Sequence, residues 1–92
     1  MGGPWLEFLR VPAMSAGLYR LPAGGRDEQT PHREDEVYVV LEGRATLEVD
    51  GDRVAVGPHS IVFVPANADH RFVDIQEDLV SLVVFAPAET ED

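Results

Sequence analysis

The chain contains no cysteine and no lysine, and each absence removes a class of chemistry. Without cysteine there is no disulfide, no thiolate metal ligand and no thiol nucleophile. Without lysine there is no Schiff base and no lysine of a phosphate-binding loop, since all seven basic residues are arginine. Histidine, carboxylate and hydroxyl side chains are the groups left to carry chemistry.

Positive charge is also scarce, because 17 acidic residues face seven basic ones and the formal net charge is −10. Such a surface repels phosphate backbones and anionic headgroups, so we expect neither nucleic acid nor a membrane as partner. No apolar run approaches the roughly 20 residues of a membrane helix. Residues Met1 to Arg10 lack the basic and apolar regions of a secretory signal, and we therefore expect a cytoplasmic protein.

The 92 residues, 45% of them hydrophobic, fit one compact domain spanning 1–92. Short apolar runs rich in valine alternate with glycine and proline, and no window repeats apolar residues with the period of a helix. The pattern predicts an all-β sandwich or barrel. We expect strands at Trp5–Arg10, Ala16–Leu21, Val37–Leu41, Ala45–Asp50, Arg53–Val56, Ile61–Val64, His70–Asp74 and Leu79–Phe85.

Two turn signals suggest how the central strands connect. Asp50-Gly51 is the signature of a tight hairpin, and Glu42-Gly43 indicates a second turn before it. Together they predict a meander of three strands over Val37–Val56. Because side chains alternate along a strand, Glu36, Tyr38 and Val40 share one face.

Two stretches are expected to be solvated. The segment 22–35 is polar and rich in glycine and proline, and its acidic run Asp27–Asp35 is typical of an exposed loop. Residues 87–92 are typical of an exposed acidic tail. The loop is long for so small a domain, and long loops are often functional. It contains one of the three histidines, His32.

Two histidines stand near a carboxylate in the expected topology. His32 lies four residues before Glu36, and His70 opens a later strand. Two imidazoles and one carboxylate form the face that suits non-haem Fe(II), Mn(II) or similar ions. His59 follows a proline in a turn, and we expect it to be an exposed surface residue.

From Gly24 to Asp74 the sequence resembles the cupin superfamily, whose two motifs it follows without a gap. The first motif falls on Gly24, Thr30, His32, Glu36 and Gly43, and the second on His59, Pro65, Asn67, His70 and Asp74. The chain departs from the family at four positions. Thr30 replaces the first metal-binding histidine, His59 and Asn67 replace glycines, and Asp74 replaces a final asparagine. Asparagine tolerates the left-handed conformation that glycine would adopt there.

The resemblance implies a cupin-type jelly-roll β-barrel holding one divalent transition metal ion, such as Fe, Mn, Ni or Zn. His32, Glu36 and His70 would bind it, the histidines through Nε2. Strand parity places Tyr38 and Phe72 in the lining of the same pocket, and the motif spacing adds Thr30.

Two functions remain open from the sequence. One is a metal-dependent enzyme acting on a small organic molecule, of oxygenase or isomerase type. The other is a non-catalytic ligand-binding or sensing cupin with a vacant or structural site. The resemblance also implies a homodimer, and Trp5 and Phe8 in the first strand are candidates for its interface.

Overall fold

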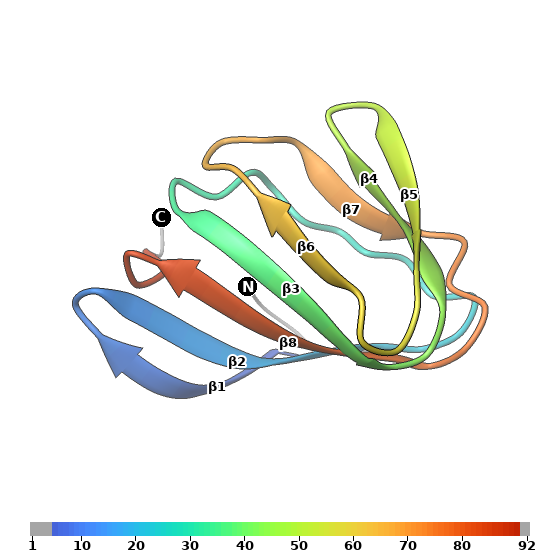
Figure 1. Cartoon of the computed structure of the whole chain (residues 1–92), viewed down its shortest axis with the longest axis horizontal. Helices are drawn as coiled ribbons and strands as arrows, with labels where there is room; N and C mark the ends of the chain where they lie inside the picture. Colours follow the sequence, from blue (N-terminus) through green and yellow to red (C-terminus); the bar gives the residue numbers. More distant parts are fainter. Residues whose placement is uncertain (1–4, 91–92) are drawn as a thin grey trace.

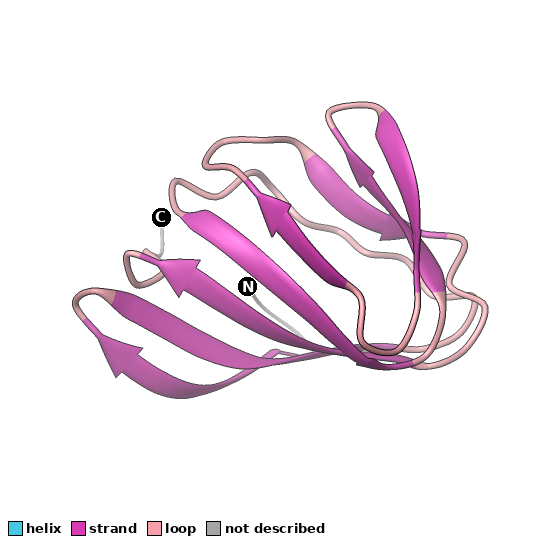
Figure 2. Ribbon diagram, viewed as in Figure 1, coloured by secondary structure: helices cyan, strands magenta, loops and turns pink. Residues whose placement is uncertain are grey.

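The computed structural model describes residues 5–90, in which every regular element is a β-strand (Figure 2). No helix in this part of the chain is long and apolar enough to cross a membrane. All eight strands expected from the sequence are present. They are β1 (Trp5–Val11), β2 (Met14–Leu21), β3 (Asp35–Glu42), β4 (Ala45–Val49), β5 (Asp52–Val56), β6 (Ile61–Val64), β7 (His70–Val73) and β8 (Leu79–Ala86).

The strands form two antiparallel sheets that lie against each other as a jelly-roll barrel (Figure 1). The larger sheet has the order β1-β2-β8-β3-β6, and the smaller has the order β5-β4-β7. Strands distant in sequence therefore lie side by side, as β2 and β8 do. This arrangement confirms the all-β jelly-roll prediction.

The predicted three-strand meander over Val37–Val56 is wrong. Strand β4 pairs with β5 and β7, whereas β3 pairs with β6 and β8 in the other sheet. Gly43 turns the chain from one sheet to the other with a φ of 91°. The position requires glycine because its Cα lies against the backbone of Asp78, and a Cβ there would be 2.3 Å from the Asp78 carbonyl oxygen. A glycine turn fixes a change of direction but not the partner of the next strand.

The hairpin at Asp50-Gly51 forms as predicted, with both residues at positive φ between β4 and β5. The alternation along β3 is also as predicted. Glu36, Tyr38 and Val40 are fully buried between the sheets. The hydrophobic core around these side chains includes Leu47, Val64, Phe72, Val83 and Phe85.

The expectation of a solvated loop at Asp27–Asp35 is wrong for two of its acidic residues. Asp27 and Glu34 are 7% and 4% exposed. The Asp27 carboxylate accepts hydrogen bonds from the Tyr19 hydroxyl, from Gln29 Nε2 at 2.5 Å and from the Phe72 backbone N–H at 2.8 Å. The loop thus runs along the free edge of β7, where a carboxylate satisfies a backbone donor that no strand pairs.

Candidate metal centre

Two loops position the candidate ligands at one end of the barrel. Asn67 adopts the left-handed conformation, with a φ of 66°, and its backbone N–H donates to the His32 carbonyl at 2.6 Å. The neighbouring Ala66 N–H donates to the Asp35 side chain at 2.9 Å. These two bonds join the loop before β3 to the loop before β7, and so bring His32 close to His70.

His32, Glu36 and His70 offer ligand atoms that all lie within 4.8 Å of one another. His70 Nε2 is 3.0 Å from Glu36 Oε1, about the separation of adjacent ligands around an ion bound at roughly 2.1 Å. The two imidazole centroids are 5.6 Å apart. Glu36 and His70 are almost completely buried, and the His32 side chain is 12% exposed, so the site reaches the solvent at His32.

Each imidazole has a hydrogen-bond acceptor at its Nδ1 atom. His70 Nδ1 lies 2.9 Å from the Ala68 carbonyl, and His32 Nδ1 lies 3.3 Å from the Glu89 carboxylate. An acceptor at this position holds the ring proton on Nδ1 and leaves the lone pair on Nε2. Both lone pairs are thereby available to an ion between the two rings.

The atoms facing this space lack other partners. His32 Nε2, His70 Nε2 and both oxygens of Glu36 are buried, and apart from the 3.0 Å approach of His70 Nε2 to Glu36 Oε1 they have no hydrogen-bond partner at short range among the described residues. When His70 is neutral, a lone pair on Nε2 meets a carboxylate oxygen, which is repulsive unless a proton or a cation lies between them. A divalent ion held by His32, Glu36 and His70 would give these buried atoms a partner, so the residues fit the metal that the motifs imply.

The same contacts shift the pKa of His70. Burial by itself lowers the pKa of this histidine. Hydrogen bonding to Glu36 and to the Ala68 carbonyl, with the negative charges of Glu36 and Asp27, outweighs burial and raises the pKa above its ordinary value.

Tyr38 and Phe72 lie beside the candidate ligands. The Tyr38 ring packs edge-on against both Phe72 and His70, with centroids 4.9 Å and 6.1 Å away. The Tyr38 hydroxyl donates to Gln29 Oε1 at 3.2 Å. Burial and the nearby Glu36 carboxylate raise the pKa of Tyr38 well above its usual value, so the phenol is neutral at physiological pH.

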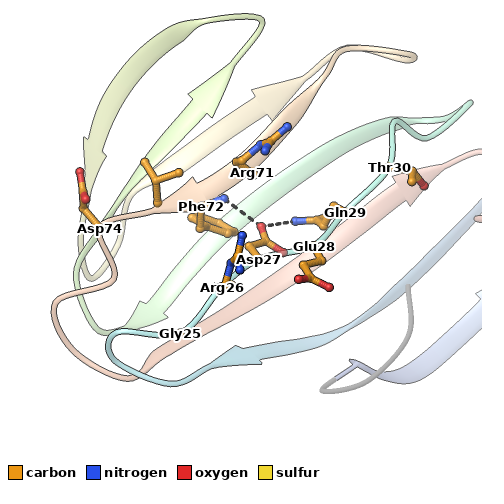
Figure 3. A pocket seen from close by; sticks show the side chains of 10 residues that line it. Gly25, Arg26, Asp27, Glu28, Gln29, Thr30, Arg71, Phe72 and Asp74 are labelled. Carbon is orange, nitrogen blue, oxygen red and sulfur yellow. Dashed lines mark hydrogen bonds between the residues drawn. The ribbon is translucent and has the colours of Figure 1, made fainter.

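Thr30 is exposed and lines a crevice of about 520 Å³ between residues 25–30 and residues 71–74 (Figure 3). The buried Asp27 carboxylate lies between the two segments, bonded to Gln29 and to the Phe72 backbone. Phe72 therefore borders both this crevice and the barrel core. His59 is exposed in the turn before β6, at a φ of 76°, and lies outside the ligand group, as predicted.

The segment after β8 folds back onto the candidate metal centre, which the sequence pattern does not indicate. Glu89 was expected in an exposed acidic tail, but it is 4% exposed and lies behind His32. Its backbone N–H donates to Ser15 Oγ at 2.8 Å, and Thr90 Oγ1 donates to Glu34 at 2.8 Å. A run of acidic residues gives no signal of which one folds back, because the partners are distant in sequence. Glu91 and Asp92 lie outside the described residues.

A jelly-roll barrel with two histidines and one carboxylate facing its interior defines a class of β-barrel proteins suited to holding one metal ion. The family model described as "Cupin domain" matches residues 17–85. The chain therefore belongs to the cupin family.

Known proteins resemble the chain in sequence and in fold. It is 50% identical over 88 residues to the uncharacterized protein SCO3923 of Streptomyces coelicolor, covering 96% of this chain and 84% of the relative. An RmlC-like cupin from Shewanella frigidimarina superposes with a TM-score of 0.80 at 23% identity, over 96% of this chain and 80% of that one.

The DMSP lyase DddQ of Ruegeria pomeroyi superposes with a TM-score of 0.77 at 25% identity, over 83% of this chain and 39% of the lyase. The chain spans less than two thirds of the length of several such structures. These likenesses support the fold, which hosts many chemistries.

Proposed function

We propose that the protein is a metal-binding cupin that takes a small organic molecule at the open positions of its ion. The observation that carries this proposal is the convergence of His32, Glu36 and His70, whose buried polar atoms have no other partner. Three protein ligands leave about three positions of an octahedral ion for water, substrate or dioxygen. A bound ion would supply Lewis-acid chemistry or, with a redox metal, dioxygen activation. An oxygenase or isomerase-type reaction is the activity that such a site supports best.

One observation favours a second candidate, a non-catalytic ligand-binding or sensing cupin. Thr30 stands where the family has a metal-binding histidine, so the ligand set is reduced to three. The phenol of Tyr38 is held neutral by its surroundings, and it is bonded to Gln29. Beyond Glu36 itself, we assign no side chain as a general base.

Anaerobic titration calorimetry with Mn(II), Fe(II) and Zn(II) tests metal binding. We expect one ion per chain for the wild type and loss of binding for His70→Ala, with His59→Ala as a control that binds as the wild type does. Oxygen uptake by the iron-loaded protein in the presence of small α-hydroxy and α-keto acids then separates an oxygenase from a sensor. Absence of binding in the wild type contradicts the proposal.

The outer face of the larger sheet carries a second feature with functional consequences. Cross-strand partners point to the same side of a sheet. Two rows of partners cross all five strands, Phe63–Val37–Val84–Ala16–Leu9 and Ile61–Val39–Leu82–Leu18–Leu6. All of these residues are apolar, and Leu6, Ile61 and Phe63 at the two edges are 60% to 72% exposed.

We propose that a second copy of the chain covers this face. The edges of this face expose more than half of Leu6, Ile61 and Phe63, and Leu9 is 40% exposed. Contiguous exposed apolar side chains commonly mark an interface, and a stable one buries roughly 800 Å² on each partner. The two rows contain no charged residue, so they are the part of this face where two copies can meet with little local repulsion despite the net charge of −10, and a symmetric dimer pairs the same surface of both copies.

Light scattering tests this dimer. We expect twice the chain mass of 10.1 kDa for the wild type, and the chain mass for Phe63→Asp. Val54→Asp is the matched control, because Val54 is 47% exposed on β5 in the smaller sheet. A wild type of single-chain mass, or a Phe63→Asp variant that stays dimeric, contradicts the proposed interface.

Trp5, one of the two interface candidates from the sequence, packs against Phe85 of the same chain, with ring centroids 5.9 Å apart.

A further inference from the structure

The two candidate histidine ligands differ in what holds them. The acceptor behind His70 is the carbonyl of Ala68, two residues away in the same turn. The acceptor behind His32 is the carboxylate of Glu89, which comes from the segment after the last strand. One histidine is therefore oriented by its own loop, and the other depends on a residue 57 positions away.

Glu89 is held in place by its neighbours. Its backbone N–H donates to Ser15 Oγ at 2.8 Å, and Ser15 is completely buried in β2. Thr90 Oγ1 donates to Glu34 Oε2 at 2.8 Å, and the Ala88 N–H approaches the Pro12 carbonyl at 3.4 Å. The segment 88–90 is thus attached to the β1–β2 hairpin and to the loop before β3, and the carboxylate of Glu89 is brought to His32 in a buried setting.

The carboxylate at this place has two effects on an ion held by His32. It keeps the ring proton on Nδ1, so that the lone pair of Nε2 faces Glu36 and His70. It also places a second buried carboxylate behind His32, at 3.3 Å from Nδ1, and with Glu36 this carboxylate would help to balance the charge of a divalent ion in a site with little solvent.

We infer that Glu89 is a positioning residue of the metal centre and that segment 88–90 is part of this centre. The inference rests on the proposed metal-binding function. It states that the carboxylate fixes the tautomer of His32 and strengthens metal binding without touching the ion. Carboxylates behind histidine ligands commonly raise metal affinity about 10-fold to 100-fold.

The first test measures zinc affinity by competition with a chromophoric chelator. We expect Glu89→Ala to bind zinc about 10-fold to 100-fold more weakly than the wild type. Glu89→Gln keeps the size and an acceptor oxygen but loses the charge, and its loss is expected to be smaller. Glu77→Ala, which removes an exposed acidic residue, is the control and binds as the wild type does. Equal affinity of Glu89→Ala and wild type overturns the inference.

The second test needs no metal and does not depend on the proposed function. Long-range ¹H–¹⁵N spectra report which ring nitrogen of each histidine carries the proton, and the chain has only three histidines. In the metal-free wild type, under conditions where His32 is neutral, we expect its proton on Nδ1. In Glu89→Ala we expect the mixture of tautomers that the exposed His59 shows.

The two tests separate the possible failures. A wild type that binds no zinc but shows the Nδ1 proton on His32 contradicts the proposed function and supports Glu89 only as the residue that sets the tautomer of His32. An unchanged His32 tautomer in Glu89→Ala shows that the segment has only a structural role. If Glu89→Ala does not fold, Glu89→Gln decides, since wild-type affinity together with a wild-type spectrum in that variant overturns the inference.

Discussion

The two faces of β3 reverse the usual distribution of polarity. The inner face carries Glu36 and Tyr38 where burial is complete, and the outer face carries Val37 and Val39 in a sheet surface with exposed apolar edges. A buried carboxylate is costly unless a positive partner accompanies it, and a large exposed apolar face commonly marks an interface. The reversal supports both proposals made above, a cation bound inside the barrel and a second copy of the chain on the outer face.

Apolar residues on the two faces of the larger sheet have different surroundings. Phe85 and Val83 on the inner face of β8 fill the core, and Phe85 also packs against His32 with centroids 5.0 Å apart. Phe63 on the outer face of β6 is 60% exposed in the single chain. Phenylalanine thus contributes to folding on the inner side, and on the outer side it contributes to the dimer proposed above.

The largest expected effect comes from truncating aromatic side chains on the two sides. Phe85→Ala should lower the free energy of unfolding by about 3–5 kcal/mol, because it leaves a cavity in the core. Phe63→Ala should change the unfolding of the monomer by less than about 0.5 kcal/mol. Denaturant titration at concentrations where the protein is monomeric measures both values. Equal losses would show that the two faces do not differ as described.

Glu36→Gln distinguishes the effect of the buried carboxylate on metal affinity from its effect on the stability of the metal-free protein. We expect metal affinity to fall at least about 100-fold, since a ligand is lost and not only its support. Under conditions where His70 is neutral, the metal-free variant should be as stable as the wild type or more stable by about 1 kcal/mol, because a neutral amide replaces a buried charge that then has no positive partner. Calorimetry and thermal unfolding without metal check the two halves. A strongly destabilised metal-free variant would indicate a structural role for the carboxylate.

Thr30→His tests whether the first family ligand can be restored. If residue 30 faces the open side of the ion, a fourth donor should raise affinity about tenfold, or about 1.4 kcal/mol. The gain should increase with pH through the range where histidine loses its proton. His59→Ala serves as the control. An unchanged affinity would mean that the exposed position of Thr30 in the crevice persists when metal binds.

The smallest expected effect concerns the tyrosines inside the barrel. Burial raises the pKa of both Tyr19 and Tyr38, with Asp27 adding to the shift at Tyr19 and Glu36 at Tyr38. A phenol with a raised folded pKa keeps its full contribution to stability below the unfolded pKa of about 10 and loses it as pH rises further. Ultraviolet titration should therefore show both phenols ionising only as the protein unfolds. A separate tyrosinate transition near the ordinary pKa would contradict their burial.

The sequence predicted the strands and the facing of β3 because both depend on local alternation. It also predicted the left-handed position of Asn67, which fills a glycine site of the motif. It failed where the partner is distant. The pairing of β4 depends on β7, and the burial of Asp27 and Glu89 depends on the Phe72 N–H and on His32. An acidic residue in a loop has the same local signal whether it is solvated or folded inward.

The most direct test of the metal centre is an anomalous-difference map from crystals of the protein purified without added chelator and loaded with Mn(II) or Fe(II). The account predicts one peak per chain at bonding distance from His32 Nε2, His70 Nε2 and the Glu36 carboxylate. The absence of a peak among these three residues, or a peak at another place in the molecule only, would contradict it.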